Sequence, residues 1–362
     1  MGRINVLVVD DSVVIRRLVT TVLEGDPDIT VVGTAASGRI AITKLSQVAP
    51  DCVTLDMEMP DLDGLGTLRE LRRTHPRLPV IMFSTLTERG AGATLDALAL
   101  GANDYVCKPA NVGSVPEAIA SVRDQLVPKI KALCPQLLGA PPAVRRRAPS
   151  VPAQSGGAPG GRIDVLTIGS STGGPDALST VLTQLPASFP VPVVIVQHMP
   201  PVFTRMFAQR LDGKCALSVK EAEHGDVVVP GRVLIAPGDK HLELTRVGTS
   251  VVAQLTSGPP EHFCRPAVDV LFRSVAQVYG GSTLAVVLTG MGSDGARGAE
   301  VLRGAGAEVV AQDEASSVVW GMPGAVVGAG LAHRVLPLSQ VAADVIGVAS
   351  RARPSARSGA RR

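Results

Sequence analysis

The chain has 362 residues, of which 45% are hydrophobic and only 2% aromatic, and its formal net charge is +3. This length allows two domains with full cores, while the small charge and the scarcity of aromatic side chains argue against nucleic-acid binding. Five scattered cysteines without a C-x-x-C pair, and no apolar run of about 18 residues, predict a cytoplasmic protein without disulfides, a zinc site or membrane insertion.

The first segment alternates apolar runs with amphipathic stretches, a rhythm that predicts a doubly wound parallel α/β sheet. The predicted strands are Ile4–Val9, Thr30–Thr34, Cys52–Leu55, Val80–Phe83 and Asp104–Val106. Helices are predicted between them, for example over Val13–Leu23 and Gly64–Arg73. We assign this first domain to residues 1–128.

Polar side chains stand at the ends of four of these strands. Asp10 and Asp11 follow the first strand, Asp56 ends the third, Ser84 ends the fourth and Lys108 follows the fifth. In a parallel sheet these ends share one edge, so we expect the five side chains to lie together. Any one of the acids alone would be interpreted as a helix cap. The set predicts a Mg²⁺ site with a lysine and a hydroxyl for phosphoryl oxygens, and Asp56 as the phosphoryl acceptor.

The first domain resembles the receiver domain of two-component response regulators. The matching motifs are Val9-Asp10-Asp11-Ser12, Asp56-Met57-x-Met59-Pro60-x-x-x-Gly64, Ser84 and Lys108-Pro109. The resemblance implies that a histidine kinase is the phosphodonor and that Asp56 is phosphorylated. It also implies that Asp11, Asp56 and the Glu58 carbonyl hold Mg²⁺, with Asp10 close by, and that Lys108 and Ser84 contact the phosphoryl group.

Residues 129–161 are rich in proline, glycine and arginine and predict a flexible linker. A second alternating pattern over residues 162–350 predicts another doubly wound, Rossmann-like sheet, and a disordered basic tail follows at 351–362. Its predicted strands are Ile163–Ile168, Val193–Gln197, Val233–Ala236, Leu284–Leu288 and Glu308–Ala311. Its predicted helices are Pro201–Leu211, Pro266–Val278 and Gly295–Ala305.

The most informative motif of the second domain is Gly169-x-Ser171-x-Gly173, between a predicted strand and a helix. This G-x-S-x-G pattern presents a serine on a sharp turn, although a plain turn or a phosphate cradle would also fit. A serine nucleophile needs a base and an acid that orients it. His198 and Asp294 each follow a predicted strand, so we expect both at the same edge as Ser171.

Three alternatives to this interpretation stay open. His241 is the second candidate base and Asp176 the second candidate acid, although Asp176 is explained by capping of a helix. Gly290-x-Gly292-x-x-Gly295, with Asp313-Glu314 further on, also matches a dinucleotide-binding fingerprint and would suit an oxidoreductase. A receiver that controls an interaction domain without catalysis is the third possibility.

Almost the whole chain resembles the chemotaxis response regulator protein-glutamate methylesterases. Beyond the receiver the match includes Gly169-Ser170-Ser171-Thr172-Gly173-Gly174, Gln197-His198-Met199-Pro200-Pro201, Ile235-Ala236-Pro237-Gly238-Asp239-Lys240-His241, Arg265-Pro266-Ala267-Val268-Asp269-Val270-Leu271-Phe272, Leu288-Thr289-Gly290-Met291-Gly292-Ser293-Asp294-Gly295 and Gly321-Met322-Pro323. The resemblance implies hydrolysis of glutamyl methyl esters on the cytoplasmic domains of chemoreceptors. It also implies deamidation of receptor glutamines, and a catalytic domain that needs no cofactor.

The resemblance further implies that Ser171, His198 and Asp294 are the catalytic triad. It assigns the Met291 backbone N–H to the oxyanion hole and Thr172 to a place beside the nucleophile. Two positions depart from the family pattern: Ser170 replaces a usual alanine, and Cys264 stands where some relatives have a histidine. We also expect that the unphosphorylated first domain blocks the catalytic edge and that phosphorylation of Asp56 releases the block.

Overall fold

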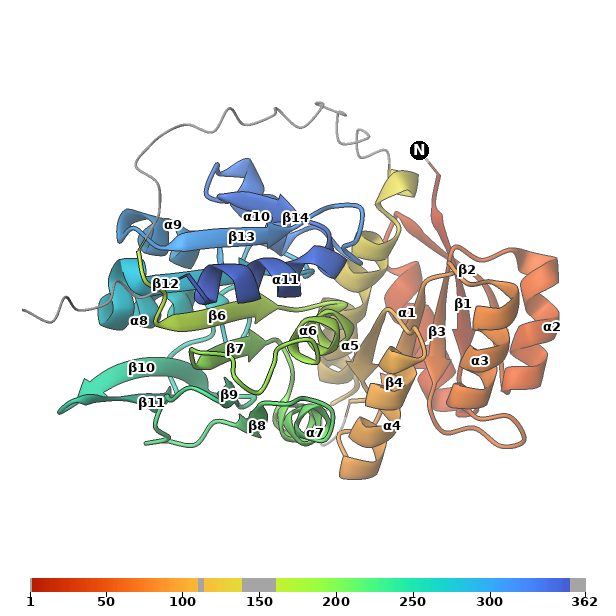
Figure 1. Cartoon of the computed structure of the whole chain (residues 1–362). Coiled ribbons are helices and arrows are strands. Elements are labelled where there is room, and N and C mark those ends of the chain that lie inside the picture. Colours follow the sequence, from red (N-terminus) through yellow and green to blue (C-terminus); the bar gives the residue numbers. More distant parts are fainter. Residues whose placement is uncertain (1, 110–113, 139–160, 352–362) are drawn as a thin grey trace, which may run out of the picture. The chain divides into compact units, whose positions relative to one another are not determined.

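The computed structural model describes residues 2–109, 114–138 and 161–351 (Figure 1). The chain divides into two compact units, Met1–Gly156 and Gly157–Arg362. Most of the predicted linker and all but the first residue of the predicted basic tail lie outside the described residues. In the part that is described, no helix is long and apolar enough to cross a membrane.

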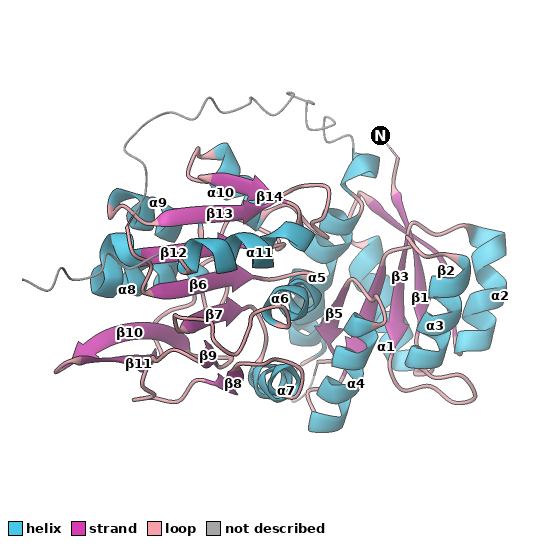
Figure 2. Ribbon diagram, in the orientation of Figure 1, coloured by secondary structure: helices cyan, strands magenta, loops and turns pink. Residues whose placement is uncertain are grey.

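The first unit is a five-stranded sheet in the order β2-β1-β3-β4-β5, and all its pairings are parallel. Its strands are β1 (Ile4–Val9), β2 (Ile29–Ala35), β3 (Cys52–Asp56), β4 (Val80–Ser84) and β5 (Asp104–Cys107). Its helices are α1 (Val13–Glu24), α2 (Gly38–Val48), α3 (Gly64–Thr74), α4 (Glu88–Ala99) and α5 (Val115–Leu133). Helix α1 packs against α5, whereas α3 packs against both α2 and α4 (Figure 2). The predicted doubly wound fold is confirmed.

Short polar side chains fix where these helices begin. Ser12, Ser37, Asp63, Thr87 and Ser114 precede α1 to α5 in turn, and each accepts a hydrogen bond from a backbone N–H in the first turn. Such caps satisfy N–H groups that have no partner inside the helix. The boundaries that place the phosphoryl-acceptor edge are therefore encoded locally.

The predicted end of the first domain at residue 128 is wrong. Helix α5 continues to Leu133, and a short 3₁₀ helix, η1 (Pro135–Leu138), follows it. Val122, Leu126 and Ile130 recur at every fourth position of α5, and all three are buried in the core of this unit. The apolar period thus runs past the proline inside the helix, and residues 129–138 belong to the first unit.

The second unit is a seven-stranded parallel sheet in the order β14-β13-β12-β6-β7-β9-β8. Its strands are β6 (Val165–Ser170), β7 (Val193–Gln197), β8 (Ser218–Glu221), β9 (Arg232–Ile235), β12 (Thr283–Val287), β13 (Glu308–Gln312) and β14 (Arg334–Leu336). Its helices are α6 (Gly174–Leu182), α7 (Pro201–Asp212), α8 (Val268–Tyr279), α9 (Ala296–Gly304), α10 (Met322–Gly328) and α11 (Leu338–Ala349), with a 3₁₀ turn, η2 (Gly280–Ser282). Every residue of β6, β7, β12 and β13 is buried, as expected of a sheet covered on both faces.

An antiparallel hairpin stands apart from this sheet. It consists of β10 (His241–Val247) and β11 (Ser250–Thr256), and β10 packs on α8. In the sequence, only the stretch Leu242–Thr245 of this hairpin has a strand-like pattern. A two-residue turn begins at Gly248, whose φ of +59° favours glycine, and that turn is the local signal for the hairpin.

The order of the strands determines where the site forms. Strand β6 has β7 on one side and β12 on the other, because the chain first extends the sheet through β7 and later returns to add β12 on the opposite side of β6. In open α/β sheets, ligands bind beside the carboxyl ends of the strands at this reversal. The carboxyl ends of β6, β7 and β12 lead to Ser171, His198 and the loop that carries Asp294 (Figure 1).

Candidate active site

The candidate nucleophile lies on the turn between β6 and α6. The Ser171 N–H donates to the Thr289 carbonyl at 3.0 Å, and the Ser171 carbonyl accepts from Gln197 Nε2 at 2.9 Å. Gly173 has a φ of +75°, and a Cβ there would lie 2.6 Å from the Val318 Cβ. Only glycine fits this position without strain, so the glycine of the motif fixes the turn that presents Ser171.

Ser170, the other serine of the motif, has a different environment. It is fully buried at the end of β6, and its Oγ donates to Gln197 Oε1 at 2.7 Å. Gln197 Nε2 in turn donates to the carbonyls of Ser171 (2.9 Å) and His198 (3.3 Å). Ser170 therefore orients a glutamine that clamps the backbone beside both candidate catalytic residues. The sequence analysis missed this role of Gln197, for which its position directly before His198 was the only signal.

The candidate base and acid are in direct contact. His198 Nε2 lies 2.8 Å from Asp294 Oδ2, and the imidazole side chain is 11% exposed. The His198 N–H donates to the Ser170 carbonyl at 3.2 Å, which ties the base to the strand that leads to the nucleophile. The contact between His198 and Asp294 agrees with the pairing expected from the sequence.

Asp294 is buried where α8 begins, and its carboxylate accepts hydrogen bonds from several N–H groups. Oδ2 accepts from the Val268 N–H at 2.6 Å, and Oδ1 accepts from the Asp269 N–H at 2.9 Å and the Gly295 N–H at 2.9 Å. The first two N–H groups belong to the first turn of α8, where a negative charge is favoured. Burial disfavours the charge, but His198 and these N–H groups outweigh it and lower the pKa of Asp294.

The imidazole charge is also stabilised by its partners. Burial disfavours the imidazolium, but the hydrogen bonds with Asp294 and Cys264 raise the pKa of His198 to about 10. Because Nε2 is bound to Asp294, the ring nitrogen left for proton transfer is Nδ1.

The contact between nucleophile and base is not made in this structure. Nδ1 of His198 faces Cys264 Sγ at 3.5 Å, and Ser171 Oγ has no hydrogen-bond partner among residues 2–109, 114–138 and 161–351. Catalytic hydrogen bonds are often long without substrate and tighten in the complex. Proton transfer from Ser171 requires its hydroxyl to reach Nδ1, the position that the thiol faces.

The loop after β12 passes close to the nucleophile. A Cβ at Gly290 would lie 2.9 Å from the Ser171 Cβ, so glycine is needed for this approach. No described group accepts a hydrogen bond from the Met291 N–H. Thr172 is buried, and its carbonyl accepts from Thr289 Oγ1 at 2.9 Å. Assignment of the oxyanion hole to the Met291 N–H stays a prediction.

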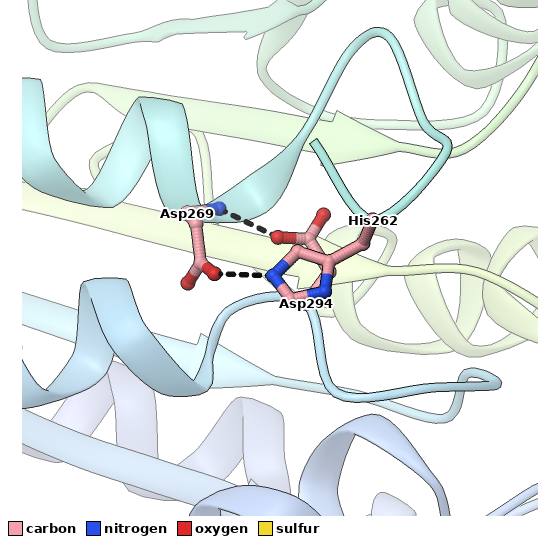
Figure 3. Close-up of side chains that lie close together, drawn as sticks. All are labelled: His262, Asp269 and Asp294. Carbon is pink, nitrogen blue, oxygen red and sulfur yellow. Dashed lines mark hydrogen bonds and ion pairs between the residues drawn. The ribbon is translucent and has the colours of Figure 1, made fainter. Parts of the chain in front are cut away.

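A second histidine–aspartate pair adjoins the first (Figure 3). His262 Nε2 lies 2.9 Å from Asp269 Oδ2, and Asp269 Oδ1 accepts from the Gly298 N–H at 2.6 Å. The Asp269 backbone N–H links this pair to Asp294. Candidate ligand atoms of His262, Asp269 and Asp294 lie within 4.8 Å of one another, but both Asp294 oxygens already accept N–H groups. The trio therefore fits a hydrogen-bond network better than a cation site, and the sequence analysis missed it.

The weaker sequence candidates have structural roles. His241 is buried, its Nδ1 accepts from the Ala267 N–H at 3.2 Å, and its Nε2 lies 3.0 Å from the Pro259 carbonyl. Asp176 lies in the first turn of α6, but its side chain accepts no capping hydrogen bond from the described residues. Asp313, proposed as a ribose ligand, accepts from the Ser316 N–H at 3.0 Å in its own turn. Asp313 is therefore engaged in its own turn, whereas its neighbour Glu314 is exposed.

The first unit contains the predicted acidic edge. Lys108 Nζ lies 2.8 Å from Asp56 Oδ1 and 3.1 Å from Asp10 Oδ2. Oxygens of Asp10, Asp11 and Asp56 lie within 4.8 Å of one another, and Asp56 Oδ2 is buried without a hydrogen-bond partner in the described chain. Burial raises the pKa of Asp56 to about 6, against the opposing effect of Lys108. This donor set of hard oxygens fits Mg²⁺.

Two other predicted residues lie beside this edge. Ser84 is buried, and its Oγ donates to the Gly90 carbonyl at 3.2 Å while it accepts from Thr94 Oγ1 at 2.6 Å. The Glu58 N–H donates to Asp56 Oδ1 at 3.4 Å. A phosphoryl contact of Ser84 and a metal contact of the Glu58 carbonyl stay predictions.

Comparisons with known proteins match both units. The family model described as CheB methylesterase matches residues 166–345, and that of the response regulator receiver domain matches residues 6–120. A protein-glutamate methylesterase/protein-glutamine glutaminase of Nocardioides sp. is 54% identical over 365 residues, covering 98% of each chain. One from Trichodesmium erythraeum is 51% identical over 350 residues, covering 96% of this chain and 99% of the relative.

Among solved structures, the catalytic domain of the Thermotoga maritima CheB methylesterase is similar to the second unit. The match has a TM-score of 0.51 and 44% sequence identity, and it covers 52% of this chain and 99% of that domain. The relative is thus a free-standing domain of the size of the second unit.

Proposed function

The chain belongs to the protein-glutamate methylesterase/protein-glutamine glutaminase family and is an enzyme, and we propose that it hydrolyses glutamyl methyl esters of chemoreceptors through an acyl-enzyme at Ser171. The observation that carries this proposal is the His198–Asp294 contact of 2.8 Å at the strand ends beside the Ser171 turn. A nucleophile, a base and an acid that orients the base are the parts that acyl transfer by serine needs.

Each residue has a defined part in the proposed reaction. Asp294 holds the proton on Nε2 of His198, so Nδ1 accepts the Ser171 proton while Oγ attacks the ester carbonyl. The protonated imidazole then returns the proton to the methoxide leaving group, and methanol departs. Water, activated by the same Nδ1, hydrolyses the glutamyl ester of Ser171. The buried Asp294 carboxylate stabilises the imidazolium in both steps.

The negative oxygen of the tetrahedral intermediate needs N–H donors. The Met291 N–H has no acceptor among the described residues, and the preceding residue, Gly290, lies close to the Ser171 side chain. One such donor is worth about 10²–10³ in kcat in well-studied hydrolases. With an amide in place of the ester, the same steps release ammonia and deamidate a glutamine, the second activity in the names of these relatives.

Replacing each serine separately tests the assignment. Ser171→Ala should abolish methanol release from methylated receptor and prevent a covalent acyl-enzyme. Ser170→Ala should retain the acyl-enzyme and most of the activity, because its Oγ is buried and bonded to Gln197. Loss of the acyl-enzyme in Ser170→Ala alone would show that the nucleophile is misassigned. An inactive parent protein that still binds receptor would favour a non-catalytic interaction domain.

We also propose that phosphorylation of Asp56 controls the esterase. Asp56 is buried at the acidic edge, where one of its carboxylate oxygens has no partner among the described residues and Lys108 lies at 2.8 Å, which suits an acceptor whose product gains negative charge. Mg²⁺, when bound by Asp11 and Asp56 with Asp10 nearby, neutralises charge on the incoming phosphoryl group. Lys108 orients the phosphoryl oxygens.

Methanol release by the full chain tests this control. A small acyl phosphate donor with Mg²⁺ should raise the activity of the wild-type chain and leave Asp56→Asn at its basal rate. Residues 162–350 form a separate unit with its own core, so they serve as the unrestrained reference. If this fragment is no more active than the unphosphorylated full chain, release of a block is the wrong mechanism.

A further inference from the structure

Cys264 contacts the catalytic base and plays no part in the reaction proposed above. Its Sγ lies 3.5 Å from Nδ1 of His198, and the opposite ring nitrogen lies 2.8 Å from Asp294 Oδ2. A nucleophile, a base and an orienting acid are thus connected in one line, which is the arrangement that activates cysteine in hydrolases. In this structure the thiol, rather than the Ser171 hydroxyl, is the partner of the base.

We infer that Cys264 is a reactive thiol, activated by His198, and that its alkylation by a small uncharged electrophile inactivates the esterase. The part about inactivation rests on the proposed function, whereas the reactivity of the thiol does not. The chemical class of the modifying ligand is a soft carbon electrophile, for which a thiolate is the preferred nucleophile.

The turn that carries Cys264 holds the thiol against the imidazole. The Glu261 N–H donates to the Cys264 carbonyl at 3.1 Å, and the Cys264 N–H donates to the Glu261 carbonyl at 2.8 Å. Between them His262 and Phe263 have φ values of +51° and +61°, a left-handed conformation that side chains rarely adopt. The His262–Asp269 pair anchors this strained turn on α8, which keeps the backbone of Cys264 beside the base.

Access to the turn is open on one side. Phe263 is 104% exposed, and Cys264 itself is only partly buried. A reagent of a few heavy atoms can therefore reach the Cys264 thiol from the solvent, while His198 contacts it within the site. The same exposure argues that Phe263 does not shield the sulfur by packing over it.

The charge distribution favours the reactive form of the pair. Burial opposes the cation, but the partners of His198 raise its pKa to about 10, and one of these partners is the Cys264 sulfur. These partners favour the imidazolium that forms when the Cys264 proton moves to Nδ1, and the adjacent cation then stabilises the thiolate. The geometry carries the proposal, and this charge balance agrees with it.

The chemical step conserves atoms and electrons. The Cys264 proton moves to Nδ1, and the sulfur lone pair forms the S–C bond to the methylene carbon of iodoacetamide as the C–I bond breaks. Iodide leaves with the bonding electrons. The resulting thioether carries an acetamide group beside Nδ1, so the Ser171 hydroxyl can no longer reach the base.

The chain offers an internal reference for the reactivity of Cys264. Cys215 follows α7, is also partly buried, and has its pKa raised by burial and by Asp212. No histidine contacts Cys215 in the described residues. Alkylation of both thiols in the same molecule therefore compares a thiol beside an imidazole with one whose thiolate is disfavoured, and the His198 variant isolates the contribution of the imidazole.

Site-resolved alkylation of the full chain tests the proposal. We would treat the wild-type protein with iodoacetamide near neutral pH and follow the labelling of each cysteine by peptide mass spectrometry. We expect Cys264 to react at least about tenfold faster than Cys215, as an imidazole-paired thiolate should. His198→Asn should remove this advantage while the labelling of Cys215 stays the same, which also reports whether the variant is folded.

Activity supplies the second readout. Methanol release should fall in proportion to the label on Cys264, whereas Cys264→Ala should retain its own starting activity throughout the treatment. Equal labelling rates for Cys264 and Cys215 would overturn the proposal, as would full activity at complete labelling. Ser171→Ala should label like the wild type. If that variant is still an active esterase, the nucleophile assignment fails while the labelling result stands.

Discussion

Replacement of Asp294 by asparagine separates two roles of this side chain, which orients His198 and accepts hydrogen bonds from buried backbone N–H groups. Each carboxylate oxygen accepts two N–H groups: Oδ2 accepts from His198 and Val268, and Oδ1 accepts from Asp269 and Gly295. The asparagine amide has only one oxygen, so its NH₂ group must face one of these pairs. If the NH₂ group faced Asp269 and Gly295, the backbone N–H groups of both residues would be buried and unpaired. If it faced His198 and Val268, only the Val268 N–H would be unpaired, because the imidazole can change its tautomer and accept from the NH₂ group.

The second orientation is therefore favoured, and it moves the imidazole proton to Nδ1. The base nitrogen would then be occupied, and we expect kcat to fall roughly 10⁴-fold, or about 5.5 kcal/mol of transition-state stabilisation, as for the wrong tautomer in serine hydrolases. The unpaired Val268 N–H and the lost negative charge near α8 should lower the free energy of unfolding by about 1–3 kcal/mol.

The assay pairs single-turnover methanol release with thermal unfolding. Asp269→Asn is the matched control, since Asp269 is equally buried and also faces a histidine but does not contact His198 through its side chain. It should lower stability with a much smaller effect on kcat. A loss of stability in Asp294→Asn with a decrease in kcat below about tenfold would refute the argument that Asp294 fixes the tautomer.

Two further predictions concern the base His198 and the close approach of Gly290 to Ser171. The acid limb of kcat/KM should lie above the ordinary pKa of histidine, and Cys264→Ala should move it to lower pH in a pH–rate profile, because the thiol contact raises the pKa of His198. An unmoved limb would exclude this coupling. Gly290→Ala should lower both activity and melting temperature, since its Cβ would lie 2.9 Å from the Ser171 Cβ. Gly328→Ala, which meets nothing within 4 Å, should change neither.

The fold was largely predictable because its signals are local. Apolar runs bounded by Ser12, Asp63 and Thr87 caps specify the strand–helix alternation, and parallel pairing then aligns the strand ends. Residues that share an edge could be grouped without knowledge of any distance. The end of α5 was missed because the change of composition after residue 128 was given more weight than the continuing apolar period to Ile130.

The contacts within the site were less predictable, because they depend on side-chain direction. Sequence spacing places His198 and Asp294 at one edge, but it does not tell which ring nitrogen faces the acid. It also leaves open that Ser170 points into the core toward Gln197. Cys264 lies 66 positions from His198 on an irregular turn, so no periodic pattern brings the two together.

The orientation of one imidazole connects these observations. Because Asp294 binds Nε2, Ser171 and Cys264 both depend on Nδ1, and one lone pair cannot accept two protons at once. Substrate binding must therefore exchange the thiol for the serine hydroxyl before acyl transfer begins. The thiol at position 264 thus determines the resting partner of the base while leaving the contact of the base with the acid intact.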